Sequence, residues 1–170
     1  LQGLVGGDLV GVQWVHPGAA HQLVGAVDRL VDAPGRLSGK ISVVTGSAQG
    51  FGKGIAEALH REGARVVIAD LNEPLAKEVA AALGPRAAAV RVNVADEQSV
   101  ADMIAFTVDT FGGLDLFVSN AGVLRAGGLD EMEKNDFEFV TSVNYTAFFT
   151  CTRYASRIMK AQHQADPAWM

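Results

Sequence analysis

The chain has 170 residues, of which 49% are hydrophobic, and its formal net charge is −5. This length is enough for one domain with a real core, and the apolar content excludes a disordered chain. The acidic balance, without any cluster of lysine or arginine, argues against a nucleic-acid partner.

Residues 1–36 differ in pattern from the rest, and we predict a linker or the remnant of an upstream domain there. The chain begins without Met or a basic leader, so we expect a piece of a longer protein. We expect His16 and His21 to be solvated or loosely packed, and we predict no metal site. A single cysteine, Cys151, and the lack of a run of about 18 apolar residues favour a cytoplasmic protein with no membrane partner.

From Lys40 onward, strands and helices alternate. Predicted strands span 40–45, 64–70, 87–94 and 114–122, and predicted helices span 51–63, 72–84, 96–113 and 134–161. The last helix is predicted to carry one apolar face that includes Phe137, Val143 and Cys151. Such alternation predicts an α/β fold, a Rossmann-type doubly wound parallel sheet truncated after about four strands. We assign residues 37–170 to this NAD-binding domain, incomplete at its C-terminus.

The segment TGSAQGFG, residues 45–52, lies between the first predicted strand and the first predicted helix. In parallel α/β sheets ligands bind at this position, and the free N–H groups of a helix N-terminus suit a pyrophosphate. Glycine lets the backbone approach a phosphate closely. We therefore expect Gly46 to allow the tight turn, Gly50 the close approach, and Gly52 the packing of helix on strand.

Asp70 ends the second predicted strand, about twenty residues after the glycines, where a carboxylate can accept hydrogen bonds from ribose hydroxyls. It could instead be a strand-end turn residue or a cap for the next helix. A 2′-phosphate would be repelled by this carboxylate, and neither Ser47 and Gln49 in the loop nor Leu71 supplies a cation. We therefore predict NAD rather than NADP.

The spacing of the three glycines resembles the TGxxxGxG loop of the short-chain dehydrogenase/reductase family. The segment Ser119 to Gly122, SNAG, resembles the NNAG of that family, with Ser119 in place of the first Asn. The resemblance covers roughly residues 37–160. It implies that Asn120, Ala121 and Gly122 stabilise the central sheet and line the cofactor site.

Two further positions extend the resemblance. Asn144 resembles the family's helix Asn, whose local distortion holds a water in a proton relay, and it is our one candidate catalytic residue. Asn93 and Val94 match the family's Asp-Val pair, which contacts the adenine; Asn keeps an acceptor and adds donors. The predicted cofactor-binding residues are Thr45, Gly46, Ser47, Gln49, Gly50, Phe51, Gly52, Asp70, Leu71, Asn93, Val94, Asn120, Ala121 and Gly122.

The family's catalytic Tyr-x-x-x-Lys pair is absent from the chain. Tyr145 is followed at that spacing by Phe149, and Tyr154 by Ile158. We expect the family's Ser, Tyr and Lys to lie beyond Met170, so this chain by itself is predicted to be inactive.

The resemblance implies that the parent protein is an NAD-dependent oxidoreductase that interconverts a secondary alcohol and a ketone on a small-molecule substrate, and that it is a homo-oligomer. Several segments look similar to sugar-phosphate dehydrogenases of the sorbitol-6-phosphate 2-dehydrogenase type, or to the dehydrogenase half of fused aldolase–dehydrogenases. A sugar alcohol or sugar phosphate is therefore the expected substrate. The alternative is a non-catalytic dinucleotide-binding or sensor module of the same fold.

Overall fold

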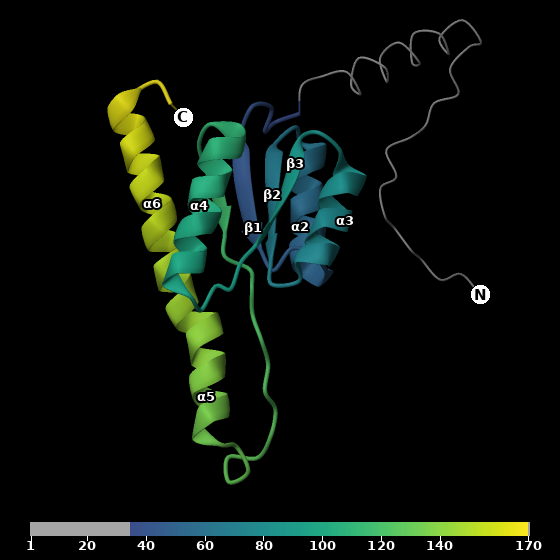
Figure 1. The fold of residues 1–170 in the computed structure, drawn as a ribbon, viewed down its shortest axis with the longest axis vertical. Coiled ribbons are helices and arrows are strands. Elements are labelled where there is room, and N and C mark those ends of the chain that lie inside the picture. The colour runs from purple at the N-terminus through teal and green to yellow at the C-terminus, as the bar shows by residue number, and fades with distance from the viewer. Residues whose placement is uncertain (1–34, 170) are drawn as a thin grey trace, which may run out of the picture. The chain divides into compact units, whose positions relative to one another are not determined.

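The computed structural model describes residues 35–169 (Figure 1). The predicted linker or remnant at 1–36, with His16 and His21, therefore lies outside the described residues, except for Gly35 and Arg36. Arg36 is joined to the body by an ion pair with Glu62, at 3.0 Å between Nε and Oε2.

Four parallel strands form one sheet in the order β3-β2-β1-β4. The strands are β1 (Ile41–Thr45), β2 (Arg65–Asp70), β3 (Ala87–Arg91) and β4 (Leu116–Val118). The connecting and following helices are α2 (Gly50–Arg61), α3 (Glu73–Leu83), α4 (Glu97–Phe111), α5 (Lys134–Thr141) and α6 (Ala147–Ala165), with a π-helical turn η1 (Ser142–Thr146) between the last two. The chain runs outward from β1 to β3 and then crosses to β4, so the direction of winding reverses beside β1. The predicted α/β fold with a four-stranded parallel sheet is confirmed.

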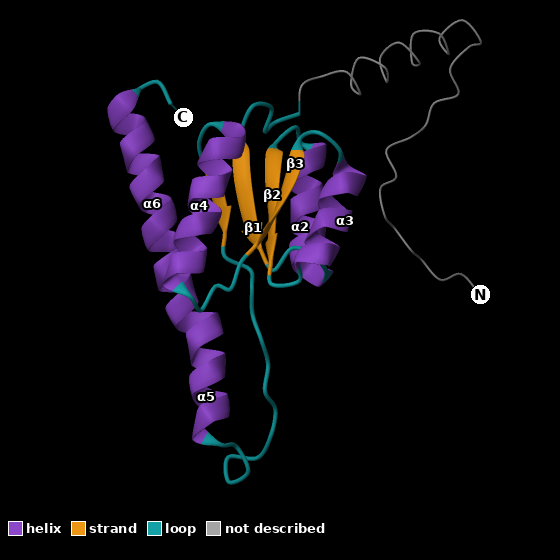
Figure 2. Ribbon diagram, viewed as in Figure 1, coloured by secondary structure: helices purple, strands orange, loops and turns teal. Residues whose placement is uncertain are grey.

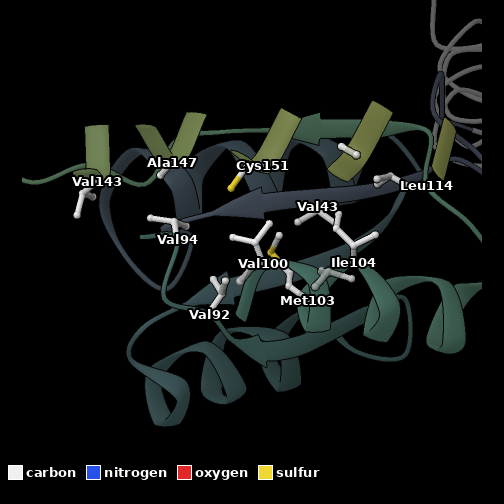
Figure 3. Close-up of a cluster of buried hydrophobic side chains, with 13 residues drawn as sticks. Val43, Val92, Val94, Val100, Met103, Ile104, Leu114, Val143, Ala147 and Cys151 are labelled. Carbon is white, nitrogen blue, oxygen red and sulfur yellow. The ribbon is translucent and has the colours of Figure 1, made fainter. Parts of the chain in front are cut away.

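Helices cover both faces of the sheet, with α2 and α3 on one side and α4 and α6 on the other (Figure 2). On the first face, Val44 and Ile68 pack with Ala56 of α2. On the second, Val43 packs with Met103 of α4 and Cys151 of α6 (Figure 3). Every residue of β1 is buried because it lies in a central parallel strand, which explains the continuous run ISVVT.

Local signals in the sequence fix where the helices begin and end. The Asp96 carboxylate accepts hydrogen bonds from the backbone N–H groups of Gln98 and Ser99, as expected for the N-cap of α4. Asn72 caps α3 in the same way through the Leu75 N–H. Gly112 ends α4 in the left-handed conformation, with φ of 94°.

The structure corrects three of the predicted boundaries. The fourth strand stops at Val118, because the Asn120 and Ala121 N–H groups donate to the Thr45 hydroxyl. The third stops at Arg91, because the Asn93 N–H donates to the Ser99 hydroxyl. The last helix continues to Ala165.

The predicted apolar face of the last helix is correct only in its second part. Val143 and Cys151 are buried, whereas Phe137 is 63% exposed. The reason is that α5 extends beyond the end of the sheet, where it has no buried residue (Figure 1). Within residues 35–169, none of the helices combines the length and apolar character that crossing a membrane requires.

Candidate dinucleotide-binding site

A cavity of about 440 Å³ lies where the strands end and the winding of the sheet reverses. Such a crevice at the carboxyl ends of parallel strands is where ligands bind in open α/β sheets. It is lined by Gly46, Gln49, Gly50, Phe51, Gly52, Asp70, Leu71, Val92, Asn93, Val94, Asn120, Ala121, Gly122, Val123, Phe139 and Val143. Residues from four separate segments of the predicted site are therefore brought together.

The glycine loop between β1 and α2 forms one wall of the cavity. Gly46 and Gly50 adopt positive φ angles of 65° and 57°, which side chains rarely tolerate. A Cβ atom on Gly50 would meet no protein atom within 4 Å, so this glycine faces open space at the N-terminus of α2. The first turn of α2 thus presents backbone N–H groups to the cavity, as a pyrophosphate site needs.

Thr45 and Asn120 join the glycine loop to the segment after β4. The Thr45 hydroxyl oxygen accepts hydrogen bonds from the backbone N–H groups of Asn120 and Ala121, at 3.0 and 3.1 Å. The Asn120 side-chain amide donates to the carbonyl groups of Thr45 and Gly46, at 2.9 and 3.2 Å. We call this set of four hydrogen bonds the Thr45–Asn120 clasp.

Asp70 lies at the end of β2 with its carboxylate at the cavity. One oxygen accepts from the Ala48 N–H at 2.9 Å, and the other accepts from the Asn72 N–H at 3.0 Å. Asp70 therefore acts as a strand-end turn residue, because these bonds hold the glycine loop and the start of α3. Each carboxylate oxygen has a further lone pair, so Asp70 can also accept from a ligand hydroxyl.

The segment after β3 supplies the far end of the cavity. The Asn93 side-chain oxygen accepts from the Ala95 N–H at 3.2 Å, while the Asn93 backbone N–H donates to the Ser99 hydroxyl at 2.9 Å. Val92 and Val94, on either side, are buried and also line the cavity. Asn93 itself is exposed.

Asn144 lies in η1, so the local helix distortion expected at this position is present. Its side-chain amide forms two hydrogen bonds with the backbone of Val123. The oxygen accepts from the Val123 N–H and the nitrogen donates to the Val123 carbonyl, both at 2.8 Å. Asn144 therefore fixes the chain just after SNAG against the helix.

Three predicted site residues lie behind the cavity rather than on it: Thr45, Ser47 and Asn144. The Ser47 hydroxyl is buried, donating to the Val44 carbonyl at 2.6 Å and accepting from the Ala69 N–H at 3.1 Å. Its side chain therefore supports the loop and is not available to a ligand. Thr45 and Asn144 are likewise occupied by backbone partners.

Four cavity residues were not predicted: Val92, Val123, Phe139 and Val143. Val92 and Val123 are direct neighbours of predicted residues, so the Asn93-Val94 and SNAG motifs could have indicated them. Phe139 and Val143 lie on α5 and η1. No local signal separates them from ordinary core residues, because their position depends on how that helix packs.

The residues that line the cavity suit a dinucleotide. Gly50 leaves open space beside the helix N-terminus, and Asp70 offers acceptors one strand away. The glycine loop would hold the pyrophosphate, and Asp70 the ribose.

Known proteins similar to this chain agree with these features. The family model described as short chain dehydrogenase matches residues 40–166. Tropinone reductase-like 1 of Erythroxylum coca is 37% identical over 133 residues, which are 76% of this chain and 49% of that protein. Sorbitol dehydrogenase of Cereibacter sphaeroides is 36% identical over 126 residues, which are 74% of this chain and 49% of that protein.

A solved structure gives the same result for the fold. The crystal structure of a short-chain dehydrogenase/reductase, glucose/ribitol dehydrogenase, from Brucella melitensis matches with a TM-score of 0.70 and 28% identity, covering 73% of this chain and 53% of that chain. This chain spans about half the length of the curated relatives it matches. The chain belongs to the short-chain dehydrogenase family, a family of oxidoreductases that normally use a nicotinamide dinucleotide.

Proposed function

We propose that this chain binds NAD and forms the cofactor half of an oxidoreductase that interconverts a secondary alcohol and a ketone. The observation that carries the proposal is the charge of the cavity. Asp70 is the one charged residue among the described residues that line it. Its carboxylate suits a ribose with free hydroxyls and would repel the 2′-phosphate of NADP.

Separate parts of the cavity would bind separate parts of the cofactor. When bound, the dinucleotide supplies the redox chemistry that protein side chains lack. The glycine loop would bind the pyrophosphate through backbone N–H groups, and the Thr45–Asn120 clasp would hold that loop in place. The chain has no Tyr-x-x-x-Lys pair, and the Tyr154 hydroxyl is bonded to Glu97 at 3.0 Å. This chain therefore contributes cofactor binding, and the described residues supply no such Tyr/Lys pair to take the hydroxyl proton.

We assign Asn144 a positioning role in the proton relay. Because both polar atoms of its side chain are engaged with Val123, a relay water would be held by the distorted backbone of η1. The side chain then holds η1 in a fixed position relative to Val123, which lines the cavity.

The proposed substrate is a sugar alcohol or a sugar phosphate. The sequence similarities described above support it, and one relative carries the name sorbitol dehydrogenase. We place the protein in the cytoplasm on the ground that its single cysteine, Cys151, is buried and free.

We also propose that the whole protein is a homo-oligomer. Three aromatic side chains on η1 and α6 are exposed in this chain: Tyr145, Phe148 and Phe149, at 78%, 56% and 64%. Apolar groups clustered on a surface in this way are typical of an interface between proteins.

Calorimetric titration with NADH and NADPH tests the cofactor proposal. We expect the chain to bind NADH more tightly, and the double variant Asp70→Ala/Leu71→Arg to weaken NADH and admit NADPH. Leu71 is suited to this change because it lines the cavity beside Asp70 and is 58% exposed. Equal or tighter binding of NADPH by the unaltered chain would contradict the proposal.

A further inference from the structure

The order of the strands indicates where the base of a bound dinucleotide lies. The glycine loop follows β1, Asp70 ends β2, and Asn93 lies two residues after β3, the outermost of the three (Figure 1). A dinucleotide with its pyrophosphate at the loop and its ribose at Asp70 therefore extends its base toward Asn93. Val92 and Val94 offer apolar contacts to the faces of a planar base, and Asn93 is the polar side chain beside them.

The hydrogen bonds of Asn93 fix which end of its amide is free. The Ala95 N–H is a donor, so the side-chain atom 3.2 Å from it must be the oxygen. The other end of the amide is then Nδ2, which has no hydrogen-bond partner among residues 35–169. Asn93 thus has a free amide donor for a ligand, beside an oxygen that uses one lone pair in the turn and keeps a second.

A donor at this position favours different bases from an acceptor. Adenine carries an amino group at position six and acceptor nitrogens in its rings, whereas hypoxanthine carries an acceptor oxygen at position six. A free amide N–H can donate to either base. A carboxylate could accept from the adenine amino group, but it would repel the oxygen of hypoxanthine.

We propose that Asn93 recognises the cofactor base through its amide donor, so that this chain accepts dinucleotides with a 6-oxopurine base as readily as NAD. The proposal rests on the proposed function, because it concerns the same dinucleotide site. Asn93 is then a specificity-determining residue, and Asn in place of Asp broadens the range of bases that bind.

The test is a pair of calorimetric titrations, with NADH and with reduced nicotinamide hypoxanthine dinucleotide, on the full chain and on Asn93→Asp. The variant keeps the turn, since a carboxylate oxygen also accepts from the Ala95 N–H. We expect the two affinities of the unaltered chain to agree within about threefold, and the variant to favour NADH by about tenfold or more. The ratio of affinities is the readout, because the added charge weakens both dinucleotides alike.

Asn72→Asp is the matched control. Asn72 also caps a backbone N–H with its side-chain oxygen, at 3.2 Å from the Leu75 nitrogen, but it does not line the cavity. Its substitution adds the same charge near the site, and the ratio of affinities should stay as in the unaltered chain.

Three results would contradict the proposal, and they differ in what else they exclude. A tenfold preference of the unaltered chain for NADH, or an unchanged ratio in Asn93→Asp, overturns the role of Asn93 while the proposed function stands. Failure of the folded, unaltered chain to bind either dinucleotide overturns the proposed function as well.

Discussion

Gly52 and Gly54 both lie in the first turns of α2, yet replacing them by alanine should have opposite effects on the free energy of unfolding. A Cβ atom on Gly52 would overlap the Gly46 carbonyl oxygen and come within 2.5 Å of the Asn120 amide nitrogen. A Cβ atom on Gly54 would meet nothing within 4 Å. The pair therefore separates crowding at the Thr45–Asn120 clasp from the general effect of alanine in a helix.

The magnitudes follow from these contacts. Alanine is favoured over glycine inside a helix by about 1 kcal/mol, so Gly54→Ala should raise the free energy of unfolding by about 0.5–1 kcal/mol. At Gly52 the same gain is opposed by overpacking, which costs about 1–3 kcal/mol. A weakened Asn120 hydrogen bond costs about 1 kcal/mol more. We expect Gly52→Ala to lower the free energy of unfolding by about 1–3 kcal/mol.

Urea denaturation followed by circular dichroism measures both variants, and NADH titration measures their binding. Gly52→Ala should also lose affinity for NADH, because the glycine loop shifts, whereas Gly54→Ala should bind as the unaltered chain does. If Gly52→Ala proved as stable as Gly54→Ala, the clasp would tolerate a methyl group and the reasoning from the Cβ contacts would be refuted.

Three further changes test other parts of the structure. Burial and the neighbouring charge of Arg86 lower the pKa of His60 from its usual 6.5, and its Nε2 has no partner among the described residues. The contribution of neutral His60 to the free energy of unfolding should therefore be fully present above pH 6.5 and be lost as the pH falls through the lower folded-state pKa. The free energy of unfolding of His60→Gln, measured by urea titration, should fall less between about pH 7 and pH 5 than that of the unaltered chain. Asn144→Ala removes both bonds to Val123, which should cost about 1–3 kcal/mol and speed hydrogen exchange of the Val123 amide, measured by NMR. Gly50→Val should abolish NADH binding in calorimetry, since a branched side chain occupies the open space for the pyrophosphate; near-native affinity in a folded variant would mean that the loop is only a turn.

The fold could be predicted from the sequence because its signals are local. The apolar run at 41–45 is long enough for a buried strand and too short for a helix, and a glycine-rich turn follows it directly. Asp96 and Gly112 mark the two ends of α4 by the chemistry of their own backbone neighbours. Four such units in succession leave few arrangements other than a parallel sheet.

The remaining features depend on contacts between distant residues. The structure brings Phe139 to the cavity and leaves Phe137 exposed, although both are aromatic residues of the same helix. Ser47 is in the middle of the glycine loop, yet its hydroxyl is bonded to strands β1 and β2. Neither outcome could be predicted from the spacing or the composition of the sequence, because each depends on which way a side chain points after the elements pack.

The three glycines of the loop differ in which atoms a side chain at each position would meet. Gly46 and Gly52 leave room for protein atoms: a Cβ on Gly46 would lie 2.8 Å from the Ala121 Cα, and one on Gly52 would press on the Asn120 amide. Gly52, which we expect to pack helix on strand, lies against the carbonyl of Gly46, the first residue after β1, and against the Asn120 amide. Gly50 alone of the three would place a Cβ atom in open space. Its φ of 57° favours glycine, and the open space beside it is where we propose that the pyrophosphate lies. TGxxxGxG and SNAG are therefore one structural unit, joined through the Asn120 amide, and Gly50 is the one glycine of this loop whose missing side chain leaves open space for the proposed pyrophosphate.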